Sequence, residues 1–116
     1  MNFQQAVQTC FRKYVDFSGR ASRPEYWWFF LAYFILAFVT GFIHEYVNLL
    51  VVLAFILPML AAGARRLHDV GRSAWFLLLG LIPVIGSLVL LYFMVQPSQP
   101  ESNLYGPPPE PLPAGI

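Results

Sequence analysis

Two long apolar runs are separated by Arg65-Arg66-Leu67-His68-Asp69-Val70-Gly71-Arg72-Ser73-Ala74-Trp75, the densest cluster of ionisable residues in the chain. One run precedes this segment over residues 47–64, one follows it over residues 74–95, and a third covers residues 25–43. Each is long enough to cross the roughly 30 Å hydrocarbon core of a bilayer as a helix. The sequence therefore predicts an all-α integral membrane protein with a three-helix transmembrane domain over residues 25–95.

The composition also favours a membrane protein. Of the 116 residues, 58% are hydrophobic, 17% are aromatic and only 11% are charged, a balance that is foreign to soluble domains. The net charge of +1 gives no basis for nucleic-acid binding. The single cysteine, Cys10, cannot form an internal disulfide. The first apolar run lacks the cleavage pattern of a signal peptide, so we expect it to stay in the mature protein.

Residues 1–24 are expected to form an amphipathic helix followed by a basic linker. The apolar positions recur at helical spacing over residues 3–14: Phe3, Ala6, Val7, Cys10, Phe11 and Tyr14. One interpretation places this helix in the membrane interface, with Arg12 and Lys13 toward anionic headgroups. The other has its apolar face packed on the protein's own helices. The sequence leaves both open.

The first two membrane helices carry clear boundary signals. Ser22 and Glu25 have the spacing of a capping box, and Pro24 falls in the first turn, where its missing N–H costs nothing. Residues 44–46 are the only polar break before the second run, so the turn between the helices must be tight. Pro58 should kink the second helix and free a backbone carbonyl that a neighbouring helix must satisfy.

The third run and the tail are less regular. Ser73 is a candidate N-cap for a helix over residues 74–95, and a straight crossing fits its length. Pro83 and Gly86 interrupt its middle, which leaves a re-entrant hairpin that returns to its starting side as the alternative. Residues 96–116 hold seven of the ten prolines and are expected to form a flexible, extended tail.

Charge predicts the orientation in the membrane. Two spans separate the basic segment before residue 25 from residues 65–73, so both segments lie on one side. The positive-inside rule places that side in the cytoplasm of a bacterial inner (plasma) membrane, as expected for a multi-pass protein. With three crossings, the turn at residues 44–46 and the tail at residues 96–116 would both face outward.

Four motifs also carry a family resemblance. They are Phe17-Ser18-Gly19-Arg20-Ala21-Ser22-Arg23-Pro24-Glu25-Tyr26-Trp27, then Arg65-Arg66-Leu67-His68-Asp69, then Ser73-Ala74-Trp75 with Pro83 and Gly86, and Asn103-Leu104-Tyr105-Gly106-Pro107. In these pieces the chain resembles the small bacterial inner-membrane proteins grouped as domain of unknown function 805, the YhaH-like proteins. Ala74 departs from the family pattern, which usually has glycine there. The resemblance implies an integral inner-membrane protein of several helices and brings no established activity, substrate or cofactor.

The candidate site is a cationic face on the cytoplasmic side. Its residues are Arg20, Arg23, Glu25, Arg65, Arg66, His68, Asp69 and Arg72. As a binding site, it would hold a phosphate, a lipid headgroup or an acidic peptide with its guanidinium groups. In the alternative interpretation the same residues pair with one another, anchor helix ends and set the topology.

No catalytic motif, cofactor motif or set of metal ligands at the required spacing occurs in the sequence, and we expect neither an enzyme nor a metal site. We therefore predict a non-enzymatic scaffold or accessory subunit that binds a partner protein or an anionic lipid headgroup through the Arg-rich face. A subunit of a small transporter or channel is the rival function, although only Glu45 lies near a span as a candidate ion ligand. Homo-oligomers are compatible with either.

Overall fold

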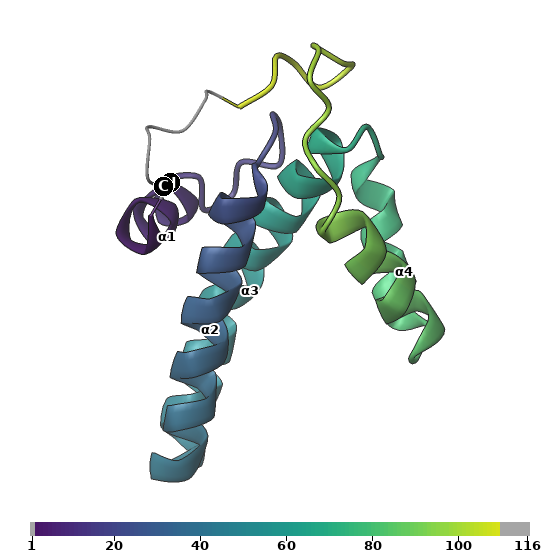
Figure 1. Ribbon diagram of the computed structural model, residues 1–116. Helices are drawn as coiled ribbons and strands as arrows, with labels where there is room; N and C mark the ends of the chain where they lie inside the picture. The colour runs from purple at the N-terminus through teal and green to yellow at the C-terminus, as the bar shows by residue number, and fades with distance from the viewer. Residues whose placement is uncertain (1, 110–116) are drawn as a thin grey trace.

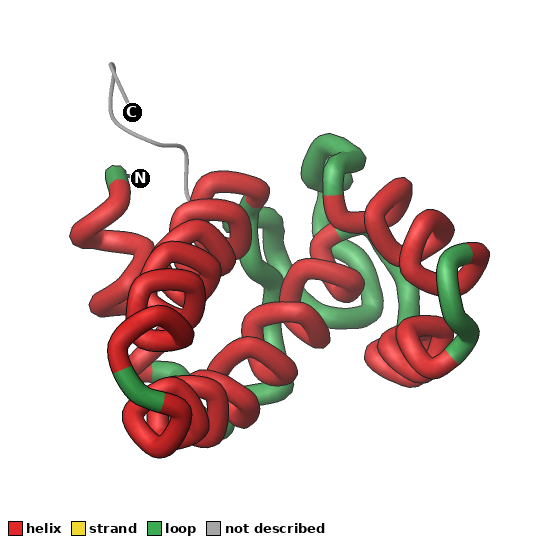
Figure 2. The backbone as a smooth tube through the Cα atoms, turned by 90° about the horizontal axis from the view of Figure 1, so that it is seen from below, coloured by secondary structure: helices red, strands yellow, loops and turns green. Residues whose placement is uncertain are grey.

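The computed structural model describes residues 2–109, and every helix or strand element in this part of the chain is helical. The elements are α1 (Phe3–Arg12), α2 (Arg23–Ile43), α3 (Glu45–Asp69), the 3₁₀-helix η1 (Ala74–Leu81) and α4 (Ile85–Met94). Figure 1 shows α2 and α3 as a long antiparallel pair, with α1 lying across it near one end. The segments η1 and α4 form a second, shorter hairpin that splays away from α3, which is seen from below in Figure 2. The all-α prediction is confirmed for these residues.

The α2–α3 pair begins and turns where the sequence indicates. The Ser22 hydroxyl accepts a hydrogen bond from the Glu25 backbone N–H at 3.4 Å and caps α2. His44 alone separates the two helices. Near this turn, Asn48 Nδ2 donates to the Ala37 carbonyl at 2.7 Å and to Thr40 Oγ1 at 3.2 Å. These bonds fasten α3 to α2 at the end of the pair that lacks basic residues.

Two helices, α2 and α3, are long and apolar enough to cross a membrane. Most of their apolar residues are exposed, whereas the core helix of a soluble protein buries them. A ridge of phenylalanines along α2 shows this exposure. The exposed fraction rises from 36% at Phe30 to 54% at Phe34, 59% at Phe38 and 79% at Phe42. Such a surface is compatible with hydrocarbon rather than water.

Helix α1 packs on the α2–α3 pair. Ala6 and Cys10 are fully buried, and the Phe11 ring lies 5.3 Å, centroid to centroid, from both Phe29 and Phe55. Packing on the protein's own helices is therefore the arrangement that the structure has. Phe3 remains 44% exposed and Phe11 40% exposed, and a position of α1 in the membrane interface stays a prediction.

Helix α3 continues beyond the expected end at residue 64, so residues 65–69, expected in a loop, are helical. The helix ends in a Schellman motif, in which the Gly71 N–H donates to the His68 carbonyl at 3.0 Å and the Arg72 N–H donates to the Leu67 carbonyl at 2.8 Å. Gly71 takes a φ of +79°, which favours glycine. Because α3 extends to this motif, Arg65 and Arg66 lie on its last turns, and the helix fixes the direction of their side chains.

The expected single helix over residues 74–95 is wrong. The structure has η1 and α4 instead, and both ends of this hairpin lie at the end of the molecule where α2 begins and α3 ends (Figure 1). The Met94 carbonyl there accepts hydrogen bonds from Trp27 Nε1 at 3.1 Å and from Arg66 Nε at 3.0 Å. The chain thus returns to the end of the molecule at which the segment starts, as in the hairpin alternative, and a re-entrant course within a membrane stays a prediction.

Local chemistry explains the reversal. Pro83 has no N–H to continue a helix, and Val84 adopts a φ of +64°, a conformation of tight turns. Gly86 then lies directly against the Leu79 carbonyl, where a Cβ atom would overlap with backbone. The two interruptions in the sequence are therefore the residues at which the chain turns back.

The tail also differs from the expectation. Residues 96–109 return across the ends of α2 and α3 and are held by hydrogen bonds to Arg20, Arg66 and Asp69. Because α4 ends on the same side as α2 begins, the tail lies beside the basic residues rather than on the opposite side. The prediction of a flexible tail for residues 110–116 lies outside the described residues.

The carbonyl freed by Pro58 has a partner. Pro58 lies inside α3, four residues after Ala54, and the Tyr14 hydroxyl donates to the Ala54 carbonyl at 2.8 Å. We expect Tyr14→Phe to destabilise the protein by about 1–2 kcal/mol, because water is absent at membrane depth to replace the hydrogen bond. Thermal unfolding in detergent measures the loss.

Two controls accompany Tyr14→Phe. Tyr92→Phe removes the hydroxyl of a residue that is 62% exposed and should change little. In a Pro58→Ala background the helix regains its own N–H donor for the Ala54 carbonyl, so Tyr14→Phe should cost less there. An equal cost in both backgrounds would show that the hydrogen bond does not compensate for the proline.

Candidate functional site

The candidate residues gather at the end of the α2–α3 pair where α2 begins and α3 ends. Most of them are buried and form what we call the ion-pair cluster, which consists of Arg20, Glu25, Arg65, Arg66 and Asp69. The cluster holds three guanidinium groups and two carboxylates. It therefore buries a net formal charge of +1, which demands extensive hydrogen bonding to backbone carbonyls.

Asp69, the last residue of α3, is the centre of the cluster. Its Oδ1 accepts from Arg20 Nε at 2.9 Å, and its Oδ2 accepts from Arg66 Nη1 at 2.6 Å and from the Ser98 hydroxyl. The side chain is fully buried. One carboxylate thus joins the linker before α2, the end of α3 and the tail.

Arg20 uses all five of its N–H donors. Besides the Asp69 carboxylate, the guanidinium donates to the backbone carbonyls of Asp69 at 3.3 Å, Gln99 at 2.6 Å, Glu101 at 2.9 Å and Gly106 at 3.2 Å. Three of these carbonyls belong to the tail. Arg20 therefore holds the tail against the end of α3 by hydrogen bonds.

Arg66 ties the hairpin to the same point. Its guanidinium donates to the carbonyls of Met94 at 3.0 Å, Ala21 at 3.2 Å and Gln96, in addition to the Asp69 carboxylate. Carbonyls at the C-terminal end of a helix carry partial negative charge, so a cation is favourable at the end of α4. The position of Arg66 at the end of α3 explains why α4 must return to this side.

Arg65 forms the second half of the cluster. It pairs with Glu25 across the α2–α3 interface and donates from Nε to the Asp16 carbonyl at 3.2 Å. Its Nη2 is buried and has no hydrogen-bond partner among residues 2–109. Glu25 was predicted to close a capping box with Ser22, but in the structure its carboxylate faces Arg65 instead.

His68 lies beside the cluster and contacts the tail. Its ring stacks on Tyr105 at 3.9 Å between centroids and 2° between planes, and Nδ1 lies 2.9 Å from the Gly19 carbonyl. Because a carbonyl only accepts, Nδ1 carries the proton. Asn103 Nδ2 donates to the His68 carbonyl at 3.0 Å, and a tight turn joins Asn103 to Gly106. This Asn-Leu-Tyr-Gly-Pro motif lies at the site, which its position in the Pro-rich tail did not predict.

Arg23 and Arg72 differ from the other arginines because both are exposed. Arg23 donates to the Val95 carbonyl at 3.3 Å, and the Arg72 guanidinium lies over the Phe93 ring at 5.2 Å from its centroid. Neither forms an ion pair with a carboxylate within residues 2–109. The structure thus divides the candidate residues into a buried, paired set and two arginines that remain open to a ligand.

Two acidic groups of the N-terminal region have shifted pKa values. Hydrogen bonds from the Ser18 hydroxyl at 2.6 Å and the Ser18 backbone N–H at 3.0 Å lower the pKa of Asp16. Burial, and next the charge of Glu25, raise the pKa of the Cys10 thiol from its usual 9.0 to about 11. Cys10 is therefore a protonated, unreactive thiol at neutral pH.

We expect Cys10 to resist alkylation in the folded protein. At pH 8 the raised pKa alone lowers the thiolate fraction about a hundredfold, so maleimide labelling should be at least that much slower than in the unfolded chain. The stability that the protonated thiol contributes is present below pH 9 and is lost as the pH rises toward 11. Intact-mass spectrometry of this single-cysteine protein measures the rate, and equally fast labelling in both states would contradict the buried position.

The comparisons with known proteins can be set against this geometry. The family model of proteins of unknown function DUF805 matches residues 14–107, which contain α2, α3, the hairpin and the docked tail. This chain belongs to that family. The inner membrane protein YhaH of Escherichia coli K12 is 40% identical over 111 residues, which cover 85% of this chain and 91% of YhaH. The inner membrane protein YhaI of the same strain is 42% identical over 106 residues, covering 85% of this chain and 90% of YhaI. No solved structure matches significantly.

The resemblance inferred from the sequence motifs is therefore confirmed, and the chain is a membrane protein of the DUF805 family. Three of the four motifs that carry the resemblance meet in the structure. Residues 17–27 supply Arg20 and Glu25, residues 65–69 supply the end of α3, and residues 103–107 form the turn that stacks on His68. These three motifs thus form one site that joins distant parts of the chain.

Proposed function

We propose that this DUF805 protein is a non-enzymatic scaffold or accessory protein of the bacterial inner membrane that binds anionic phospholipid headgroups through Arg23 and Arg72. The observation that carries the proposal is the division of the arginines. Those of the ion-pair cluster are buried and each pairs with a carboxylate, whereas Arg23 and Arg72 are exposed without a carboxylate partner within the described part of the chain. An exposed, unpaired guanidinium at a membrane surface attracts phosphate.

The proposed topology has α2 and α3 crossing the membrane, with the start of α2 in the cytoplasm. All seven Lys and Arg residues lie in residues 12–23 and 65–72, whereas His44 and Glu45 stand at the other end of the pair. The positive-inside rule supports a cytoplasmic location for the basic end. The hairpin of η1 and α4 would then enter and leave on the cytoplasmic side.

The lengths of the elements support a re-entrant hairpin. Helix α3, with 25 residues, is about 38 Å long at 1.5 Å per residue. The eight residues of η1 extend about 16 Å at 2.0 Å per residue, and the ten residues of α4 extend about 15 Å. The hairpin therefore reaches about halfway through a 30 Å hydrocarbon core.

Phosphate binding suits the free donors. Arg23 uses one of its five N–H donors internally, at the Val95 carbonyl, and Arg72 is held by the Phe93 ring without hydrogen bonding to it. Both side chains flank the C-terminal turn of α4. A basic residue near an anionic membrane surface contributes about 1 kcal/mol, so two fixed arginines favour an anionic headgroup over a neutral one by about 2 kcal/mol.

Lipid retention tests the proposal. The protein is purified in mild detergent from vesicles of phosphatidylglycerol and phosphatidylethanolamine, and native mass spectrometry counts the lipids that remain bound. We expect preferential retention of phosphatidylglycerol, reduced at least tenfold in the double variant Arg23→Gln, Arg72→Gln. The variant Arg12→Gln, Lys13→Gln removes the same charge from the other side of the α2–α3 pair and should keep the bound lipid.

Two results would contradict this function. Equal loss of lipid in both double variants would show a general attraction of charge without a site. Retention of a protein that depends on Arg23 and Arg72, with no preference for phosphatidylglycerol, would instead assign this face to a partner subunit.

A further inference from the structure

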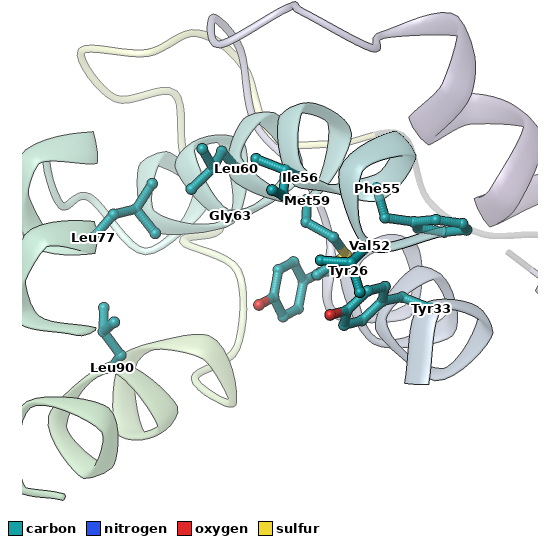
Figure 3. Close-up of a pocket in the computed structure, with 10 residues that line it drawn as sticks. All are labelled: Tyr26, Tyr33, Val52, Phe55, Ile56, Met59, Leu60, Gly63, Leu77 and Leu90. Atoms are coloured by element: carbon teal, nitrogen blue, oxygen red, sulfur yellow. The ribbon is translucent and has the colours of Figure 1, made fainter. Parts of the chain in front are cut away.

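An apolar groove separates the two hairpins of the molecule. It has a volume of about 350 Å³ and is bounded by α2, α3 and the η1–α4 hairpin. Figure 3 shows Leu77 and Leu90 on one wall, α3 with Gly63 along the second, and the rings of Tyr26 and Tyr33 on the third. The lining is apolar apart from the tyrosine hydroxyls, and the groove opens to the surroundings of the molecule.

We propose that this groove holds one acyl chain of an anionic phospholipid of the cytoplasmic leaflet, whose phosphate is bound by Arg23. The inference rests on the proposed function and adds to it a defined site for a single lipid molecule. Three observations carry it: the length of the groove, the arrangement of residues at its mouth, and a free hydroxyl inside it.

The groove has the length of one membrane leaflet. Its α3 wall runs from Gly63 to Val52, which corresponds to about 17 Å along the helix axis. The opposite wall is the hairpin, which extends about 16 Å. Half of a 30 Å hydrocarbon core is about 15 Å. An acyl chain fills such a groove completely, whereas a membrane-spanning helix of a partner or a second copy would meet the hairpin over only half of its length.

The mouth of the groove is cationic. Arg23, Tyr26 and Trp27 have i, i+3 and i+4 spacing and therefore share one face of α2. Tyr26 lines the groove, Trp27 Nε1 donates to the Met94 carbonyl, and Arg23 donates to the Val95 carbonyl one residue further on. Arg23 thus stands where α2 meets the end of α4, one helical turn before Tyr26 of the groove wall. When Arg23 binds the phosphate of a phospholipid, the acyl chain of that lipid points between the two hairpins.

Tyr26 offers a donor just inside the mouth. Its hydroxyl points into the gap in Figure 3 and makes no hydrogen bond to any of residues 2–109. The residue lies in the first turn of α2, and in the proposed topology this turn is at the membrane interface, near the ester carbonyls of a phospholipid. A hydroxyl without a partner in an apolar groove is unfavourable, and an ester carbonyl satisfies it. Arg23, Tyr26 and the groove thus match phosphate, ester and acyl chain in order.

Photo-crosslinking in nanodiscs tests the site. The probe is phosphatidylglycerol with a diazirine at the middle of one acyl chain, and phosphatidylcholine with the same chain is the comparison. We expect adducts to concentrate on residues of the groove such as Tyr33 and Leu90, at least tenfold more with phosphatidylglycerol. Arg23→Gln should abolish the preference between the two lipids.

A matched pair of variants tests occupancy of the groove itself. Ile56 and Leu57 are neighbours on α3 and are each 44% exposed, but only Ile56 lines the groove. Ile56→Trp should reduce groove adducts at least tenfold, whereas Leu57→Trp should leave them at the wild-type level. If Ile56→Trp fails to fold, the distribution of adducts on the wild-type protein still decides the question.

Four outcomes would overturn the inference. Adducts spread evenly over the exposed α2 ridge and the groove would show ordinary solvation by lipid. Equal labelling by phosphatidylglycerol and phosphatidylcholine would show that occupancy of the groove does not depend on an anionic headgroup bound by Arg23. Crosslinks from groove residues to another protein chain would assign the groove to a partner. Retention of phosphatidylglycerol through Arg23 and Arg72 without groove adducts would refute this site alone, whereas loss of all lipid preference would refute the proposed function.

Discussion

Replacing Asp69 by asparagine should destabilise the folded protein by about 3–5 kcal/mol, the cost of breaking a buried ion pair by removing one partner. The side chain is fully buried between Arg20 and Arg66, so two guanidinium groups would lose their carboxylate at once. Asparagine keeps the size of the side chain but replaces one of the two accepting oxygens of Asp69 by an NH2 group, which only donates hydrogen bonds. We expect the tail and the hairpin to loosen together, because Arg20 and Arg66 hold them.

Unfolding by heat or by SDS in mixed micelles measures this loss. Glu101→Gln is the matched control, since Glu101 is an exposed acidic residue of the same face whose backbone carbonyl alone contacts Arg20. It should change stability by less than about 0.5 kcal/mol. If Asp69→Asn were as mild as Glu101→Gln, the cluster would not organise this end of the protein.

The second large effect concerns the pair formed by Glu25 and Arg65. Glu25→Gln should also cost about 3–5 kcal/mol, because Arg65 is fully buried and would keep its charge without a carboxylate. The double variant Glu25→Leu, Arg65→Met should recover most of this loss. An apolar pair of similar volume removes both charges together with the buried Nη2 group, which has no hydrogen-bond partner in residues 2–109.

The double-variant cycle separates pairing from packing. Pairing predicts a strong coupling between the two positions, with the double variant more stable than either Glu25→Leu or Arg65→Met alone. Additive losses, measured in the same unfolding experiment, would show that each side chain acts through its own packing and that the ion pair contributes little.

The sequence predicted the features that depend on local chemistry. Ser22 and Pro24 mark the start of α2, His44 marks the tight turn, and the need for a donor to the carbonyl freed by Pro58 follows from proline itself. The extension of α3 to Asp69 was missed, although Gly71 is the residue type that a Schellman motif requires. These features involve residues within a few positions of one another.

The features that were missed depend on contacts over long sequence separations. Apolar composition cannot distinguish a crossing helix from a hairpin. Local chemistry at Pro83 and Gly86 permits the reversal, and the hydrogen bonds from Arg66 and Trp27 to the Met94 carbonyl hold the end of the hairpin at this side of the molecule. Proline content suggested a free tail, but Arg20 binds the tail through backbone carbonyls, which any sequence provides. The candidate residues come together in the structure, and their burial decides which arginines are paired with carboxylates and which stay exposed.

The central claim is that both ends of the η1–α4 hairpin lie on the side where α2 begins. Single cysteines at the exposed positions Ser18, Glu45 and Ser102, in a Cys10→Ser background, test it with a membrane-impermeant thiol reagent. Intact spheroplasts and inverted vesicles expose opposite faces of the membrane. We expect Ser18→Cys and Ser102→Cys to be labelled only in inverted vesicles and Glu45→Cys only in spheroplasts. Labelling of Ser102→Cys together with Glu45→Cys would show that residues 74–95 cross the membrane and would contradict the re-entrant hairpin.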